Sequence, residues 1–170
     1  NVNTVARQFK EAGYATGLLG KSHLQHGMSR NAVLPYRGQG SSRSAFPEGW
    51  DAIEDGERYI GNPTADPEDF YGFDHIELSI DHGASISGHH LQWAMAKGGD
   101  KDRLFIDQDT DTQGTDRSQH WRQIYRPPYP EDWHSTAYAT ERTIEFIERQ
   151  QRAQKPFFAW CSFPDPHHPM

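Results

Sequence analysis

The sequence predicts an α/β protein built around a mostly parallel sheet with flanking helices. Two observations support this: a helix-like segment is followed by a short apolar strand twice, and each strand runs into a polar loop that contains histidine. Alternation of helix and strand is typical of parallel sheets. Ligands of such sheets bind just beyond the carboxyl ends of the strands, so these two loops are the first candidates for a functional site.

The first helix–strand pair occupies residues 2–19. Apolar residues recur at helical spacing over 2–12, Asn3 or Thr4 is available as the N-cap, and Gly13 is expected to end the helix. Residues 14–19 are then predicted to form a short buried strand, and 20–23 the loop at its carboxyl end.

The second pair lies near the end of the sequence. A long helix is predicted over residues 134–154, with Ser135 or Thr136 as its cap and an apolar face that comprises Ala137, Ile144, Phe146 and Ile147. Residues 157–163 form a continuous apolar run, which is typical of a strand buried on both faces. Cys161 lies inside this run, so we expect a buried, inert thiol.

The middle of the sequence is less regular. A further strand is expected within residues 71–80 and a helix over 86–97. Residues 25–70 and 99–133 are polar and lack a sustained period, so we interpret them as two loop-rich excursions. Aromatic residues in the variable segments are available to shape a pocket for an aryl, sugar or quaternary ammonium group: Tyr71, Trp93, Trp121, Tyr125 and Trp133.

Composition excludes several classes of protein. The net charge is -7 and no cluster of Lys and Arg stands out, so no nucleic-acid partner is expected. No stretch approaches the ~18 apolar residues of a membrane span, so no membrane partner is expected either. The single cysteine excludes a disulfide framework. Leu, Ile, Val and Phe make up only 28 of 170 residues, and the sequence starts at Asn1 without a methionine. Together these features predict part of a larger protein.

Lys21 and His23 are the first candidate site residues. They are two residues apart, so in an extended loop their side chains project to the same side. A fixed positive charge beside a histidine suits a tetrahedral oxyanion such as sulfate or phosphate. The alternative is an exposed lysine and a capping histidine. The octet 15–22 also approaches a nucleotide-binding P-loop, but Ala15 replaces the first glycine and no strong helix follows Ser22.

The second candidate is the segment 166–169, Pro-His-His-Pro. Its prolines restrict the backbone of His167 and His168, and a stiff loop at a strand end can hold an imidazole against an anion or a metal. The alternative is a turn with incidental histidines.

Other polar clusters are weaker candidates. Asp107, Asp109 and Asp111 alternate like the start of a calcium loop, but the glycine and glutamate that this motif requires are Thr112 and Ser118, so a solvated acidic loop is expected. Three further histidines lack metal-motif spacing and are expected to be structural or on the surface: His82, His89 and His90.

Residues 13–24 closely resemble the second signature segment of the sulfatase family, Gly-Tyr-x-Thr followed after two or three residues by Gly-Lys-x-His. Residues 157–169 are similar to the later strand of that family, which ends in Pro-His-x-Pro, and residues 135–147 resemble the helix before it. The resemblance implies an alkaline-phosphatase-like α/β sandwich and the hydrolysis of sulfate esters, so that 1–170 would be part of a catalytic domain.

The resemblance also implies roles for individual residues. Lys21 would hold a sulfate or leaving-group oxygen, and His23 would hydrogen-bond the formylglycine hydrate that serves as nucleophile. His167 would contact the sulfate or act as general acid to the leaving oxygen, and His168 would face elsewhere. These roles amount to charge stabilisation and proton transfer around an anionic transition state.

The sequence departs from the family pattern in several respects. It contains no Cys-x-Pro-x-Arg segment, and Cys161 has the wrong proline spacing and no arginine, so it is not the nucleophile. The paired aspartates that precede the nucleophile in the family are absent, as are the Asp-Asn or Asp-His pair and the lysine that follow this region, so the formylglycine precursor and the Ca²⁺ ligands are expected outside this chain. The implied partners are a small sulfate ester and a formylglycine-generating enzyme. The isolated chain is expected to be inactive.

Two alternatives stay open: a phosphonate or phosphate ester hydrolase of the same superfamily, and a non-catalytic oxyanion binder or inactive fragment. For a bacterial source, the cytoplasm and the periplasm are both compatible.

Overall fold

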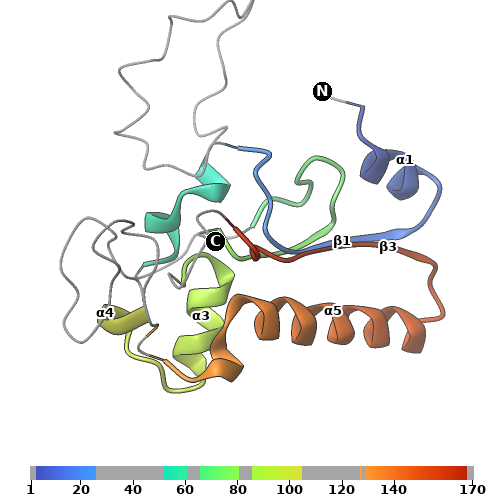
Figure 1. Ribbon diagram of the computed structural model, residues 1–170. Helices are drawn as coiled ribbons and strands as arrows, with labels where there is room; N and C mark the ends of the chain where they lie inside the picture. Colours follow the sequence, from blue (N-terminus) through green and yellow to red (C-terminus); the bar gives the residue numbers. More distant parts are fainter. Residues whose placement is uncertain are drawn as a thin grey trace, which may run out of the picture.

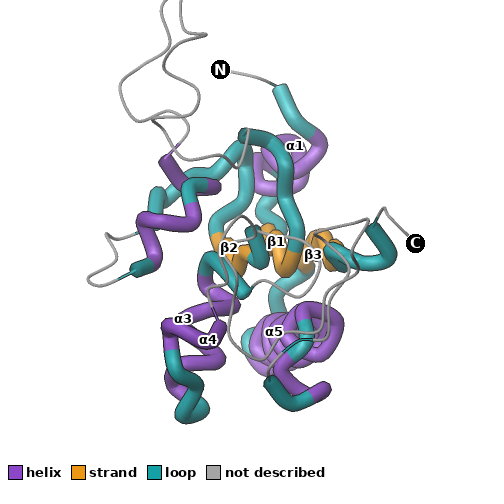
Figure 2. Tube along the Cα trace, turned by 60° about the vertical axis from the view of Figure 1, so that its left-hand side comes forward, coloured by secondary structure: helices purple, strands orange, loops and turns teal. Residues whose placement is uncertain are grey.

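A three-stranded parallel sheet forms the centre of the structure, a computed structural model that describes residues 3–25, 52–60, 66–80, 86–104, 127 and 129–167. The strands lie in the order β2 (His75–Leu78), β1 (Ala15–Gly20) and β3 (Phe157–Ser162). Helix α1 (Val5–Glu11) packs on one face and α5 (Ser135–Arg152) on the other (Figures 1 and 2). The predicted α/β class with parallel strands is confirmed.

Shorter elements surround this sheet. Helix α3 (His89–Ala96) packs against β2 and against α4 (Lys101–Leu104). Three 3-10 turns complete the described part: η2 (Ala52–Glu54), η3 (Gly56–Tyr59) and η4 (Glu131–Trp133). The two predicted excursions therefore contain short helical segments where the structure describes them.

The central strand β1 is buried along its whole length, as the sequence predicts. Its side chains alternate between the two faces: Leu18 joins the cluster under α1, and Ala15 and Leu19 pack against Phe146 of α5. The hydroxyl of Thr16 is buried too, and it donates to the carbonyl of Gly72 at 2.8 Å. A satisfied hydroxyl avoids the cost of an unpaired polar group in the core.

Two glycines of β1 allow neighbouring elements to approach closely. A Cβ atom at Gly17 would lie 2.7 Å from the ring of Phe146, so α5 rests directly on the backbone there. At Gly20 the constraint is stronger, because a Cβ atom would lie 1.9 Å from the carbonyl oxygen of Ser162 and φ is +105°. Only glycine adopts that backbone conformation without strain.

The N-terminal cap of α1 agrees with the sequence, whereas that of α5 does not. Thr4 accepts a hydrogen bond from the amide of Arg7 at 3.1 Å, as predicted. Helix α5 is capped by His134, whose Nδ1 accepts from the amide of Thr136 at 3.3 Å, and not by Ser135 or Thr136. Ser135 is unavailable because its hydroxyl donates elsewhere, to Asp165 at 2.8 Å.

The buried face of α5 also differs from the prediction. Phe146 is buried, but Ile144 and Ile147 are exposed and Ala137 is only partly covered. The buried residues of the helix are Ser135, Tyr138, Ala139, Phe146 and Gln150. Tyr138 has a fully buried aromatic ring, although it was not part of the predicted apolar face.

Strand β3 was expected to be buried on both faces, and this is wrong for the described residues. The exposed fractions are 38% for Phe157, 41% for Trp160 and 46% for the following Phe163. Cys161 is likewise exposed, against the expectation of a buried thiol. The physical reason is that β3 lies at the edge of the described sheet, so α1 and α5 cover only part of it.

We predict that Gly20→Ala destabilises the fold far more than Gly13→Ala does. Both glycines have positive φ, but nothing lies within 4 Å of a Cβ atom at Gly13. Gly13→Ala should therefore cost only the backbone strain of about 1 kcal/mol, whereas Gly20→Ala should cost about 3 kcal/mol or more because Ser162 must move. Urea unfolding of both variants measures the difference. Equal losses would contradict the close approach of β1 to β3.

Candidate anion-binding site

The carboxyl ends of the three parallel strands meet at one edge of the sheet. The amide of Lys21 donates to the carbonyl of Ser162 at 2.7 Å, and the amide of Ser79 donates to that of Gly20 at 3.0 Å. The loops that follow β1 and β3 therefore leave the sheet side by side, although they are far apart in the sequence. The predicted site residues Lys21 and His23 lie in the first loop and His167 lies in the second.

Lys21 is half-buried at this edge. Its ammonium group donates to the carbonyl of Ile80, just beyond the end of β2. The side chain thus lies across the carboxyl ends of the strands, and its positive charge stays at the edge where the loops converge.

Glu54 anchors the loop that contains His23. This carboxylate, only 3% exposed, accepts a hydrogen bond from the Ser22 hydroxyl at 2.5 Å and another from the amide of Leu24 at 3.0 Å. The amide of Glu54 in turn donates to the Gln25 side chain at 3.0 Å. Sequence reasoning missed Glu54, because a contact across about thirty residues leaves no local pattern.

His23 lies between the two anchored residues in an unusual backbone conformation. Its φ is +148°, outside the range that L residues normally adopt, and its side chain is exposed. Such conformations persist only where the surrounding structure enforces them, and they gather at functional sites. The bonds from Ser22 and Leu24 to Glu54 provide that enforcement here.

A second polar cluster fixes the loop after β3. Asp165 accepts from the Ser135 hydroxyl at 2.8 Å and lies 3.6 Å from Nε2 of His134, so it ties this loop to the start of α5. The serine, histidine and aspartate do not form a nucleophilic triad. The hydroxyl donates to the carboxylate, and Nδ1 of His134 is occupied by the amide of Thr136. The cluster positions the segment that leads to His167.

His90 lies beneath this edge as a structural histidine, which confirms that expectation. Its ring is fully buried and stacked on Tyr138 at 4.5 Å. Nε2 donates to the carbonyl of Trp133 at 2.7 Å, which leaves Nδ1 as the acceptor for Ser79 at 3.3 Å. Burial lowers the pKa of His90 to about 4, although the hydrogen bond to the Trp133 carbonyl acts to raise it. The ring is therefore neutral at pH 7.

The remaining histidine and acidic candidates give no metal site in the described part of the chain. His89 hydrogen-bonds Asp66 at 2.8 Å, a structural contact. His82, His168 and the three aspartates at 107, 109 and 111 lie outside the described residues. Within the described ranges, no group of three or more His, Cys, Asp or Glu side chains could hold a metal ion. No described helix is long and apolar enough to cross a membrane.

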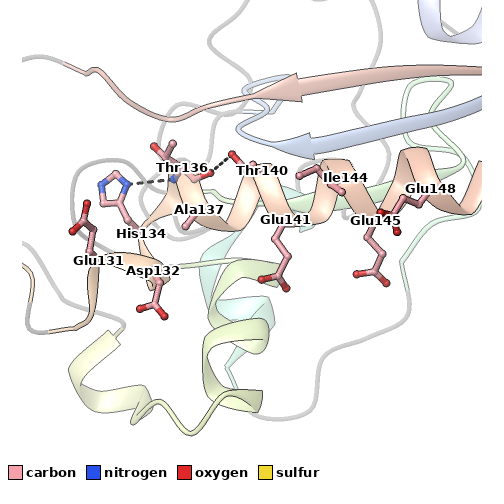
Figure 3. A pocket seen from close by; sticks show the side chains of 10 residues that line it. All are labelled: Glu131, Asp132, His134, Thr136, Ala137, Thr140, Glu141, Ile144, Glu145 and Glu148. Carbon is pink, nitrogen blue, oxygen red and sulfur yellow. Dashed lines mark hydrogen bonds between the residues drawn. The ribbon is translucent and has the colours of Figure 1, made fainter.

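A large hollow of about 1320 Å³ lies along the outer surface of α5 (Figure 3). Figure 3 shows Glu141 and Glu145 pointing away from the strands. Both carboxylates are in ion pairs, Glu141 with Lys97 and Glu145 with Arg142. Neither Lys21 nor His167 lines this hollow, so the candidate site at the sheet edge is separate from it.

A scan against protein-family models, a search of curated proteins and a search of solved structures found no match to this chain. The resemblance to sulfatases therefore rests on the motifs in the sequence.

We predict that Glu54→Ala loosens the loop at residues 21–25. The amide of Leu24 and the hydroxyl of Ser22 would both lose their buried acceptor, which should lower the free energy of unfolding by about 2 kcal/mol. Hydrogen exchange at the Leu24 amide should accelerate more than tenfold. Glu57→Ala, an exposed glutamate on the neighbouring turn, is the control and should change stability by less than about 0.5 kcal/mol. Unchanged exchange at Leu24 would contradict the anchoring role.

The buried His90 makes stability depend on pH. An unfolded chain binds the histidine proton near pH 6.5, whereas the folded protein binds it only near pH 4. Stability from this group is therefore complete above pH 6.5 and is lost as the pH falls towards 4, by about 3 kcal/mol. His90→Gln should remove this part of the pH dependence. Leu91→Ala, the control in the same core, should lower stability at pH 7 and leave the slope unchanged. Equal slopes in wild type and His90→Gln would contradict this account.

Proposed function

We propose that this chain supplies part of the oxyanion site of a sulfatase, an enzyme that hydrolyses sulfate esters. The supporting observation is the parallel pairing of Gly20 with Ser162, continued by the bond from the Lys21 amide to the Ser162 carbonyl. This pairing brings the loop that contains Lys21 and His23 and the loop that leads to His167 to one edge of the sheet. Both segments that resemble sulfatase motifs thus begin at the location where parallel sheets bind ligands.

The chemistry of the three residues fits a sulfate ester. Lys21 provides a permanent positive charge for a sulfate oxygen, and an ammonium held at the edge needs little reorganisation to receive it. His23 and His167 each carry ring nitrogens that can donate to an anionic oxygen. His167 is proposed as the proton donor to the leaving oxygen, because departure of an alkoxide is easier when it is protonated as the bond breaks.

The proposal includes the alkaline-phosphatase-like sandwich as the fold of the complete catalytic domain. Calcium would neutralise the sulfate oxygens and formylglycine would supply the nucleophile. By the resemblance, both belong to sequence outside these 170 residues. The chain has no Cys-x-Pro-x-Arg segment from which formylglycine could form. The residues of this chain act by binding and orienting the substrate and by donating a proton.

The test uses the gene product that contains this segment, co-expressed with a formylglycine-generating enzyme. We expect hydrolysis of p-nitrophenyl sulfate, and we expect Lys21→Ala, His23→Ala and His167→Ala each to lower kcat/KM by about 10²-fold or more. Lys155→Ala, an exposed lysine just before β3 at the opposite end of the strands, is the matched control and should retain full activity.

Three outcomes would contradict the proposal. Faster hydrolysis of a phosphonate monoester than of the sulfate would favour the related phosphonate hydrolases. Sulfate binding without hydrolysis would indicate a non-catalytic oxyanion binder. Wild-type activity in the Lys21 and His167 variants would remove these residues from the reaction.

A further inference from the structure

A second pocket, of about 400 Å³, lies beside β2, away from the loops that follow the strands. Its wall combines residues from four parts of the chain: the segment at 66–67, the start of β2, α3 and α5. The side chains that matter for its chemistry are Asp66, Asp74, Glu77, Gln92, Trp93 and Arg142. The volume is within the range of small-molecule sites, roughly 300–1,000 Å³.

The charges in this wall are compensated in pairs. The ion pairs of its three carboxylates are Glu77 with Arg142, Asp66 with Arg58 at 3.3 Å, and Asp74 with Lys10 at 2.6 Å. Burial alone would raise the pKa of Glu77, but the hydrogen bonds from His75 and Arg142 lower it, so the carboxylate stays ionised. The pocket therefore presents oriented donors and acceptors without a large net charge, which favours a neutral ligand over an ion.

One side-chain donor of this pocket lacks a hydrogen-bond partner among the described residues. It is Nε2 of Gln92, which is buried in the wall. A buried donor without an acceptor costs about 1–3 kcal/mol, and a bound oxygen atom recovers that cost.

The aromatic side of the pocket is held in a fixed position. The indole Nε1 of Trp93 donates to Glu141 at 2.8 Å, and its ring packs edge-on against Tyr138 at 5.3 Å. The ammonium of Lys97 lies 3.8 Å from the ring centroid. A rigid indole offers apolar surface at little cost in side-chain entropy.

We propose that this pocket binds a neutral polyhydroxylated molecule the size of one monosaccharide unit. Each hydroxyl group both donates and accepts, so the ligand can donate to the wall carboxylates and accept from Gln92. The C–H face of such a molecule suits the apolar surface of Trp93. The site does not include Lys21, His23 or His167, and the inference does not depend on the proposed sulfatase function.

The test uses the 170-residue chain with D-glucose and N-acetyl-D-glucosamine as probes, in titration calorimetry and saturation-transfer NMR. We expect at least one sugar to bind with a dissociation constant in the millimolar range, and sodium sulfate and ethanolamine not to compete with it. Gln92→Leu removes the buried donor at similar volume and should weaken binding at least fivefold.

Asp66→Asn is the second variant, because it keeps the shape of the wall while it removes a carboxylate acceptor, and it should weaken sugar binding. Gln151→Leu, an exposed glutamine of α5 outside the pocket, is the control and should bind like wild type. Thermal unfolding confirms that each variant is folded. The proposal is overturned if neither sugar binds at about 50 mM, if both variants bind like the control, or if ethanolamine or sulfate displaces the sugar.

Discussion

The arrangement of the molecule depends on the close contact of the β1 backbone with its neighbours on both sides. Gly17 allows Phe146 of α5 to rest on the strand, and Gly20 allows the Ser162 carbonyl to approach to a distance that no side chain permits. The parallel pairing with β3 then continues into the first residue of the loop, through the amide of Lys21. The candidate site exists because two glycines let strands from opposite ends of the sequence end at the same place.

The polar anchors beneath this edge show how the loops acquire fixed geometry without regular structure. A buried glutamate is expensive to desolvate, and it is tolerated here because two donors from the 21–25 loop satisfy the same carboxylate oxygen. Asp165 does the same for the loop after β3, through Ser135. One carboxylate thus holds each loop: Glu54 reaches the 21–25 loop from a distant segment, and Asp165 of the second loop binds the distant Ser135. Anchors of this kind fix the geometry of a site in advance, so that binding an anion does not require the loops to become ordered.

The sequence predicted those features that depend on local pattern. The helix at α1 with its Thr4 cap, the buried strand β1 and the strand β3 followed by the His167 loop are all visible in periodicity and in glycine or proline positions. It failed where the answer depends on distant partners. Ser135 is a good cap by type, but Asp165 takes its hydroxyl. In the sequence alone, nothing distinguishes Glu54 from a surface glutamate. Its role depends on its contacts with the distant 21–25 loop.

The exposed aromatic side chains of strand β3 bear on the proposed fold of the complete domain. Its side chains are apolar on both faces, which is the composition of an interior strand, yet Phe157 and Trp160 are about 40% exposed within the described residues. Solvent exposure of large aromatic side chains on both faces of one strand is unfavourable, because about 25 cal/mol is gained for each Å² of apolar surface buried. A wider sheet with further covering elements would remove this exposure. The proposed sandwich would provide such a sheet, so the exposure of these side chains on β3 agrees with that proposal.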